Sequence, residues 1–390
     1  MTEYTCSVCD EHFGVCAKKF DEKEKELTND ENKCILHCDK VGWEEIHNLH
    51  RVNFFWKKMK DYYNMIMRVY KENKNKENKK LYEFYQVKFP IFMDTFSDFY
   101  EFNEDFKKNK VEQWDIKFLK CTFYKNIDFI HLFYAKNITF RDCEFMNNIE
   151  LKNQSFEHNF LFEECTVYKN ITFQMIQFKN FTSFIGTTFN KEVNFKHTKF
   201  YDLALFNNTK INKLRLENTF FMDESNFLNM KNEKKQPLKS KNIHDRETAR
   251  IIKHSFEKIN NIIEANQYYA IEMEKRKDEL KIWKNPFDWL VFKFHRLSSN
   301  HSQNWILPIF WIFFISYLVT SVKTTYGIFE TILYNIFIYG VLDKMANIIN
   351  PFSIMIRGES LTFNMLFFKV IIAYLMYQFV VSIRQNTRRK

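Results

Sequence analysis

Two groups of metal-ligating side chains near the start of the chain are the residues best suited to chemistry. One group is Cys6 and Cys9, which are separated by two residues, and the other begins at Cys34. A tetrahedral Zn²⁺ ion takes four sulfur or nitrogen ligands, and a two-residue spacer lets both members of a pair reach one ion. We therefore predict a structural zinc site. Its expected ligands are Cys6, Cys9 and Cys34, with either His37 or Cys38 as the fourth.

The same residue types allow other interpretations. His12 and Cys16 lie between the two groups and are further candidate donors, and ordinary buried or unpaired thiols are the alternative to a metal site. A catalytic zinc is disfavoured, because no glutamate stands nearby at a spacing typical of hydrolases or deaminases.

The rest of the sequence carries no enzyme motif. Only 6 of the 390 residues are glycine, which leaves little material for a phosphate-binding loop. Neither a Gly-x-Ser-x-Gly elbow nor a zincin helix is present. We predict no catalytic residue and no cofactor other than zinc, and we expect a protein that is not an enzyme.

The middle of the chain contains a repeat of large apolar residues. They recur at alternating steps of five and six residues, which fits neither the 3.6-residue period of a helix nor the two-residue period of a strand. Such spacing fits a solenoid whose short segments each place one large side chain in a shared core. The first comb is Phe118, Phe129, Phe140, Leu151, Phe162, Phe173, Phe184, Phe195 and Phe206. The second comb is Phe123, Tyr134, Phe145, Phe156, Val167, Phe178, Phe189, Phe200 and Ile211.

Smaller residues recur within the repeat at longer intervals. Cys121, Cys143 and Cys165 are evenly spaced, and Thr187 and Thr209 continue this column at the same interval. The interval predicts a coil of 22 residues, and at a strand spacing of about 4.8 Å roughly five coils would be about 24 Å tall. A column of asparagines 11 residues apart is expected to form tight corners, because asparagine tolerates unusual backbone angles. Its members are Asn126, Asn137, Asn148, Asn159 and Asn170.

The stretch NITFRDCEF at residues 137–145 places the bulky Phe140 and Phe145 five residues apart, with the small Cys143 two positions before Phe145. In this pattern the repeat resembles the pentapeptide-repeat family, in its variant of alternating five- and six-residue units, and the chain resembles the membrane-anchored bacterial type. The resemblance implies a right-handed, four-sided β-helix. This sequence often places Ile or Val, not Ala, before the first-comb residue, which predicts a slightly swollen coil.

The predicted fold is therefore mixed, with a β-solenoid between helical segments. Residues 1–42 form the cysteine-rich segment, residues 43–110 a helical and aromatic region, residues 111–230 the solenoid and residues 231–243 a polar linker.

A long amphipathic helix is predicted over residues 244–280, because apolar residues step by three and four from Ala249 to Met273. Two roles are open for this helix. It either caps the open end of the solenoid, whose aromatic core must be covered, or it forms a coiled coil in which Asn266 is the polar core residue that sets the register.

The last segment, residues 298–390, contains apolar runs long enough to cross a membrane. Spans are predicted at residues 305–322 and 363–383, and residues 324–342 are either re-entrant or a third span. Two spans are favoured, because basic residues flank both sides and the positive-inside rule then places both termini in the cytoplasm. Residues 281–297 mix aromatic and basic residues and are predicted to lie at the membrane interface.

The net charge of +10 is concentrated at this end. The balance of Lys and Arg over Asp and Glu is −1 for residues 1–110, 0 for residues 111–230 and +11 for residues 231–390. A neutral rod is a poor mimic of DNA, so we expect no nucleic-acid partner. The first residues contain charges and no apolar run of a secretory signal. We expect a multi-pass protein of the inner (cytoplasmic) membrane, with the solenoid and both termini in the cytoplasm.

Solenoids offer wide, rigid surfaces more than cavities, which suits binding. We therefore expect a membrane-tethered scaffold for a protein partner that the sequence does not identify. The alternative is a subunit of an oligomeric ion channel or pore, gated through the solenoid. A span, a shorter apolar segment, a polar stretch with Asp343 and Asn347 and a final span follow the order of simple channels, and the heptad helix would supply a homo-oligomer.

Overall fold

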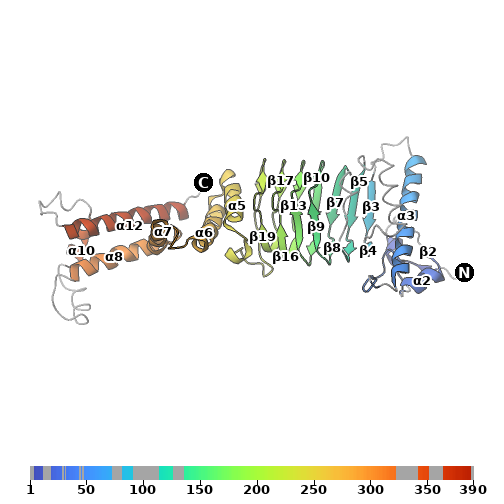
Figure 1. The fold of residues 1–390 in the computed structure, drawn as a ribbon, viewed down its shortest axis with the longest axis horizontal. Coiled ribbons are helices and arrows are strands. Elements are labelled where there is room, and N and C mark those ends of the chain that lie inside the picture. Colours follow the sequence, from blue (N-terminus) through green and yellow to red (C-terminus); the bar gives the residue numbers. More distant parts are fainter. Residues whose placement is uncertain are drawn as a thin grey trace. The chain divides into compact units, whose positions relative to one another are not determined.

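Figure 1 shows the computed structural model of the chain. It describes residues 4–11, 19–28, 30, 32–43, 45, 48–72, 81–90, 114–125, 136–321, 341–350 and 363–387. The chain divides into two compact units, Met1–Phe256 and Glu257–Lys390. The first unit contains the strands, and the described elements of the second unit are helices.

A parallel β-solenoid makes up most of the first unit, as the repeat predicted. It has about five turns between residues 115 and 226, and its strands form parallel sheets of seven, eight and four members. The seven-stranded sheet runs β21 (Ser225–Asn226), β18 (Ala204–Leu205), β15 (Thr182–Ser183), β11 (Phe160–Glu163), β7 (Asn137–Arg141), β5 (Asp115–Leu119) and β3 (Leu81–Tyr85). The eight-stranded sheet runs β4 (Lys88–Phe89), β6 (Thr122–Phe123), β8 (Glu144–Phe145), β12 (Thr166–Val167), β16 (Thr188–Asn194), β13 (Ile171–Gln174) and β9 (Ile149–Lys152), with β19 (Lys210–Arg215) beside β16. The four-stranded sheet runs β10 (Ser155–Phe156), β14 (Gln177–Phe178), β17 (Lys199–Phe200) and β20 (Phe220–Phe221).

The length of one solenoid turn agrees with the cysteine column. The Asn137 amide donates to the Asp115 carboxylate of the previous turn at 2.7 Å, across an offset of 22 residues. Phe118 pairs with Phe140 in the strand register at the same offset. The last turn is one residue shorter, because Phe200 pairs with Phe221, and the pairing of β16 with β19 contains a register irregularity.

Phenylalanine rings stacked from turn to turn form the core. Phe118 and Phe140 stack with ring centroids 4.8 Å apart and an interplanar angle of 6°, and Phe173 stacks on Phe195 at 5.0 Å. These distances match the strand spacing, because each ring lies above the equivalent ring of the previous turn. Four such columns run through the core. They contain the stacked pairs Phe118–Phe140, Phe123–Phe145, Phe173–Phe195 and Phe156–Phe178.

The column of small residues also lies in the core. Its members are Cys121, Cys143, Cys165, Thr187 and Thr209. The Cys143 thiol donates a hydrogen bond to the carbonyl oxygen of Phe118 at 3.2 Å, and the Thr187 hydroxyl donates to that of Phe162 at 2.7 Å. Both donors are buried. A small side chain with one donor satisfies a buried carbonyl group at this position, which explains why both cysteine and threonine occur there.

The left-handed backbone angles lie at residues other than the predicted asparagines, of which Asn126 is outside the described residues. Asn148 and Asn170 have no left-handed backbone angle; instead, the Asn148 side chain accepts a hydrogen bond from the Asn170 N–H at 3.2 Å. Left-handed φ angles occur two residues after the first comb, at Lys120, Asp142, Asn153, Glu164, Met175, Gly186, His197 and Asn208. This conformation turns each N–H toward the next turn, where the Glu164 N–H donates to the carbonyl oxygen of Ile185 at 2.8 Å. Such bonds offset a backbone cost of about 1–2 kcal/mol per non-glycine residue, so residue type at the corner is weakly constrained.

The solenoid begins before residue 111. Strand β3 pairs in parallel with β5, so that Phe84 lies on Phe118, and β4 pairs with β6, so that Phe89 lies on Phe123. Residues 81–90 therefore supply two strands of an additional turn. The step along the chain from Phe84 to Phe118 is longer than that from Phe118 to Phe140, which hides this turn from a search for a constant period.

Helix α3 (Leu49–Glu72) covers this first turn. Phe55 meets Phe89 edge to face with ring centroids 6.0 Å apart, and the Tyr62 hydroxyl donates to the carbonyl oxygen of Glu83 at 2.9 Å. The apolar side of α3 thus shields the aromatic core at this end.

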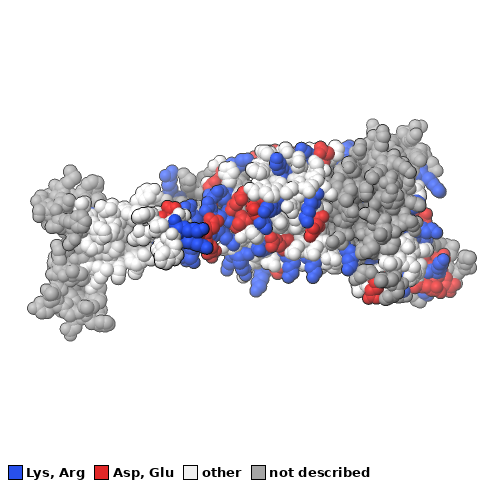
Figure 2. Space-filling model, in the orientation of Figure 1, with Lys and Arg blue, Asp and Glu red and all other residues white. Residues whose placement is uncertain are grey.

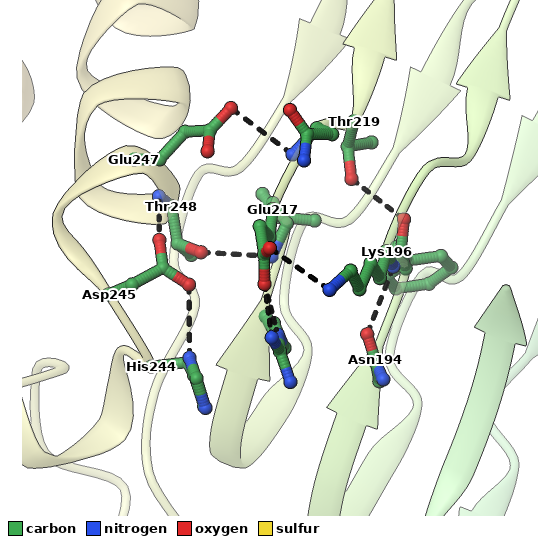
Figure 3. A network of polar contacts seen from close by, with 12 residues as sticks. Asn194, Lys196, Glu217, Thr219, His244, Asp245, Glu247 and Thr248 are labelled. Carbon is green, nitrogen blue, oxygen red and sulfur yellow. Dashed lines mark hydrogen bonds and ion pairs between the residues drawn. The ribbon is translucent and has the colours of Figure 1, made fainter.

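Helix α5 (Arg246–Lys258) covers the other end, with the contacts drawn in Figure 3. The Thr248 hydroxyl accepts a hydrogen bond from the Leu216 N–H at 2.9 Å, and the Glu247 carboxylate accepts one from the Asn218 N–H at 3.1 Å. The helix therefore provides acceptors to N–H groups that otherwise would need another turn of solenoid. This is the capping role that was one of the two expectations for this segment.

The single helix predicted over residues 244–280 is wrong, because the segment forms two helices. Helix α6 spans Ile262–Glu279, and Asn260 between the helices has a φ angle of 57°. The side chain of Asn261 then caps α6 by accepting from the Glu264 N–H. Asn266 does not face a coiled-coil partner in this chain, since its amide donates to the carbonyl oxygen of Gln385 at 2.9 Å. A coiled coil between chains stays a prediction.

The second unit also contains α7 (Pro286–Ser299), α8 (Ile306–Ser321), α10 (Val341–Ile349) and α12 (Phe363–Thr387). Its core is built from Ile312, Ile372 and Leu375, and the Trp311 indole donates to the carbonyl oxygen of Leu297 at 2.9 Å, which joins α8 to α7.

Among the described residues, one helix is long and apolar enough to cross a membrane. This is the segment Leu366–Gln385 of α12, which has 20 residues, whereas the apolar stretch Ile306–Leu318 of α8 is shorter. Figure 2 shows uncharged side chains over the described parts of α8 and α12. Residues 324–340 of the predicted middle segment lie outside the described residues. The two-span topology therefore stays a prediction.

Candidate metal centre

Local backbone hydrogen bonds position the two groups of ligands. Cys6 immediately precedes helix α1 (Ser7–Glu11), which contains Cys9, and β1 (Tyr4–Thr5) pairs antiparallel with β2 (Lys19–Phe20). On the other side, the His37 N–H donates to the carbonyl oxygen of Cys34 at 3.0 Å. This turn places the two side chains of the second group next to each other.

The four ligand atoms of Cys6, Cys9, Cys34 and His37 lie within 4.8 Å of one another, and all four residues are buried. The Sγ atoms of Cys9 and Cys34 are 3.8 Å apart, and His37 Nδ1 lies 3.5 Å from the Sγ atoms of both Cys6 and Cys9. Metal bonds of about 2.3 Å to sulfur and about 2.0 Å to nitrogen give tetrahedral edges of about 3.8 Å and about 3.5 Å. These three distances agree with a four-coordinate site, and the cluster could hold a metal ion.

The hydrogen bond of His37 Nε2 determines that Nδ1 is the ring nitrogen available to a metal ion. His37 Nε2 lies 3.2 Å from the carbonyl oxygen of Tyr85. A carbonyl oxygen only accepts hydrogen bonds, so Nε2 carries the proton and Nδ1 presents its lone pair to the three sulfur atoms. A backbone carbonyl bonded to the distal nitrogen is the usual support of a histidine that ligates a metal.

Cys38 lies outside the cluster. Its Sγ atom is 3.3 Å from Nζ of Lys40, which also donates to the carbonyl oxygen of Cys38 at 2.8 Å. Lys40 is buried against the rings of Trp43 and Phe55. Of the two residues expected as alternatives for the fourth position, the structure brings His37 to the other three ligands. The predicted extra donors His12 and Cys16 lie outside the described residues.

Thiol protonation in the cluster is uneven. The hydrogen bond from the Cys34 thiol lowers the pKa of Cys6 to about 3. Conversely, the hydrogen bond to Cys6 and burial raise the pKa of Cys34. One thiolate is thus stabilised by its neighbours, which is the first step toward the deprotonated ligand set that a metal requires.

Glu24 supports the second ligand group from outside the cluster. It lies in helix α2 (Glu22–Thr28), and its buried carboxylate accepts a hydrogen bond from the Ile35 N–H at 3.0 Å. It also pairs with Lys58 of α3 at 3.0 Å. Glu24 thereby connects the turn at Cys34 to the helix that covers the solenoid. No sequence pattern indicated this role, because Glu24 lies in a run of alternating charges.

The turn also bonds directly to the first strands of the solenoid. The Lys88 N–H donates to the carbonyl oxygen of Leu36 at 2.9 Å, and the Tyr124 hydroxyl donates to the Asp39 carboxylate. The cysteine-rich segment therefore extends the capped end of the rod instead of forming a separate module.

Comparison with models of protein families, with curated proteins and with solved structures finds no match to this chain.

Proposed function

We propose that the protein is a membrane-tethered scaffold of the pentapeptide-repeat type, not an enzyme, whose head is stabilised by a structural zinc ion. The observation that carries this proposal is the connection of the metal cluster to the first turn of the rod, through His37 and Tyr85. A rod covered at both described ends, by α3 and α5, and followed in the chain by apolar helices suits a rigid binding surface attached to a membrane.

Zinc fits the donor set best. Three sulfur atoms and one nitrogen in a closed, buried, tetrahedral arrangement are typical of structural zinc sites. A closed site leaves no open coordination position for a substrate, so zinc here would contribute to folding free energy. The residues that would hold the ion are Cys6, Cys9, Cys34 and His37.

Exposed apolar side chains on the second unit support the membrane tether. Phe310 and Phe313 of α8 and Val370, Tyr377 and Val380 of α12 are more than half exposed. In water these side chains would be a source of aggregation, whereas in a bilayer they would contact lipid tails. Membrane insertion of α12, with α8 packed against it, explains this exposure.

Helix α7 and the residues before it fit the membrane interface. Trp283 is 95% exposed and Phe287 is 81% exposed, and both lie among the basic residues Lys281, Lys284 and Lys293. Aromatic side chains at the level of the head groups and lysines that contact anionic lipids are the features of an interfacial helix. Together with the basic end of the chain, they favour the cytoplasmic face of the inner membrane and a multi-pass topology.

The outward surface of the solenoid would bind a protein partner. Figure 2 shows basic and acidic side chains interspersed over its visible face, and residues 111–230 carry 14 basic and 14 acidic residues. Mixed charge without a dominant sign suits a protein partner better than a nucleic acid.

A subunit of an oligomeric ion channel is the second candidate. One observation favours it: Gln378 and Ser382 of α12 and Ser316 of α8 are buried within otherwise apolar helices. Polar residues inside membrane helices are costly and commonly mark functional positions.

The oligomeric state of the detergent-purified protein, combined with single-channel recording in a bilayer, separates the two candidates. The scaffold proposal expects no conductance from the reconstituted protein. Discrete current steps from a defined homo-oligomer would replace it with the channel.

A further inference from the structure

The turn between α7 and α8 has an unusual backbone. Asn300, His301 and Ser302 are three consecutive residues with left-handed φ angles of 48°, 56° and 64°. Each such non-glycine residue costs about 1–2 kcal/mol, so the surrounding contacts must hold the turn in place. Strain of this kind is concentrated at functional sites and switches.

Two imidazole rings meet at this turn. Nδ1 of His295 lies 2.9 Å from Nδ1 of His301, and the His301 ring packs against Phe292 with ring centroids 4.4 Å apart. His301 is 6% exposed, and its Nε2 atom has no hydrogen-bond partner among the described residues. At this separation one Nδ1 donates its proton and the other accepts it, so the contact requires that at least one ring be neutral.

The same turn is fastened to α12. The Ser299 hydroxyl donates to Oε1 of Gln378 at 2.9 Å, and the Ser302 hydroxyl donates to the same oxygen at 3.3 Å. The hydroxyls of Ser298 and Tyr374 lie 3.3 Å apart. The end of α7 and the turn therefore both contact α12 next to the histidine pair.

We propose that the turn is a proton-operated latch, in which the neutral His295–His301 pair holds the α7–α8 turn against Gln378 of α12 and protonation of the pair releases it. When the accepting Nδ1 takes up a proton, both facing nitrogens carry hydrogen atoms. The hydrogen bond between the rings is then replaced by repulsion. A positive charge is also left among Phe292 and the apolar helices, which favours a conformation open to water.

The surrounding charges do not offset this effect. On α7 the charge of Arg296 acts on His301, and it has the same sign as a protonated imidazole. Residues 306–321 of α8 contain no charged side chain. On α12 the groups that reach the turn are Gln378 and Tyr374, while Lys369 donates to backbone carbonyl oxygens of α10 and the residue that follows it. Among the described residues, no acidic side chain forms an ion pair with either histidine.

Burial supports the direction of the switch. It lowers the pKa of His295, and burial together with the positive charges of His295 and Arg296 lowers the pKa of His301 to about 4. The open turn, with ordinary histidine pKa values near 6.5, binds protons more readily than the closed turn. The closed form is therefore fully favoured above pH 6.5 and loses stability as the pH falls toward 4. For His301 alone, the opening equilibrium should shift about 30-fold between pH 7.5 and pH 5.

Amide hydrogen exchange of the full-length protein in lipid nanodiscs tests the latch directly. The N–H groups of Asn300, Ser302 and Asn304 are hydrogen-bonded within the turn and serve as probes. After correction for the intrinsic rate at each pH, protection of residues 297–304 should be at least tenfold lower at pH 5 than at pH 7.5. His301→Gln should make protection independent of pH within about twofold, and His158→Gln, an exposed solenoid residue, should leave the wild-type response unchanged.

Should His301→Gln fail to fold, His295→Gln provides the same comparison from the other ring. Equal corrected protection of the wild type at both pH values overturns the proposal, as does a pH response that survives in these variants. Added Zn²⁺ that raises protection at pH 7.5 in the wild type and not in His301→Gln also overturns it, because the pair would then be a metal site.

Discussion

His37 Nε2 lies 3.2 Å from the carbonyl oxygen of Tyr85, 48 residues further along the chain. Tyr85 ends strand β3 of the first solenoid turn. His37 presents its other ring nitrogen, Nδ1, to three cysteine sulfur atoms. The same side chain is thus bonded to the first strand of the rod. The metal cluster and the rod should therefore stabilise each other.

Metal removal should loosen the first turn more than the later turns. A strong chelator would leave the His37 ring without its ligand contact and weaken the bond to Tyr85. We expect faster amide exchange in residues 81–90 and unchanged exchange in residues 204–226. Equal acceleration in both segments would show that the metal stabilises the whole unit instead of its first turn.

Thr187→Val should destabilise the solenoid, and Thr187→Cys should do so less. Valine keeps the shape of threonine but removes the donor to the Phe162 carbonyl oxygen, at a cost of about 1–2 kcal/mol. Cysteine keeps a donor, because at the equivalent position of another turn the Cys143 thiol donates to the carbonyl oxygen of Phe118. The free energies of unfolding in urea, followed by circular dichroism, would compare the two. A valine variant as stable as the cysteine variant would mean that packing alone selects the residues of this column.

Phe173→Ala should be among the most damaging substitutions in the rod. Phe173 is fully buried and stacks on Phe195 at 5.0 Å, so its loss should cost about 3–5 kcal/mol. Phe220 is 53% exposed, and Phe220→Ala is the matched control, expected to change stability by less than about 0.5 kcal/mol. Similar losses in the two urea denaturation curves would argue against the ring column as the core.

Thr248→Ala should weaken the cap formed by α5. The substitution leaves the Leu216 N–H without its acceptor, which should cost about 1–2 kcal/mol. Lys258→Ala, at the exposed end of the same helix, should stay within about 0.5 kcal/mol of the wild type. Thermal unfolding of the two variants gives the comparison, and an unchanged midpoint for Thr248→Ala would rule out this contact as part of the cap.

The comb residues predicted the solenoid, because a core filled by one ring per segment leaves a direct imprint on the sequence, and the cysteine column predicted the length of its turn. The first turn at Phe84 and Phe89 was missed because the step from Phe84 to its partner Phe118 is longer than the regular turn. Its signal was the same local pattern, two aromatic residues five apart with Val87 two positions before the second. Corner residues could not be predicted from type, since the bonds between turns support a left-handed conformation even at Glu164 and Met175.

The metal ligands could be predicted as a group but not individually. Cys34, His37 and Cys38 all have the right chemistry, and the selection of His37 depends on a carbonyl group of Tyr85 in a strand that the sequence analysis did not foresee. The break between α5 and α6 has a similar origin. The apolar spacing continues across it, and the change at Asn260 and Asn261 is a local backbone preference that the heptad pattern does not report.

Metal content of the purified full-length protein tests the central claim most directly. The wild type and Cys38→Ser should each contain one zinc ion per chain, and the double variant Cys6→Ser and Cys9→Ser should contain almost none, because it lacks two of the four ligands. Zinc retained in full by the double variant, or lost from Cys38→Ser alone, would contradict the proposed site.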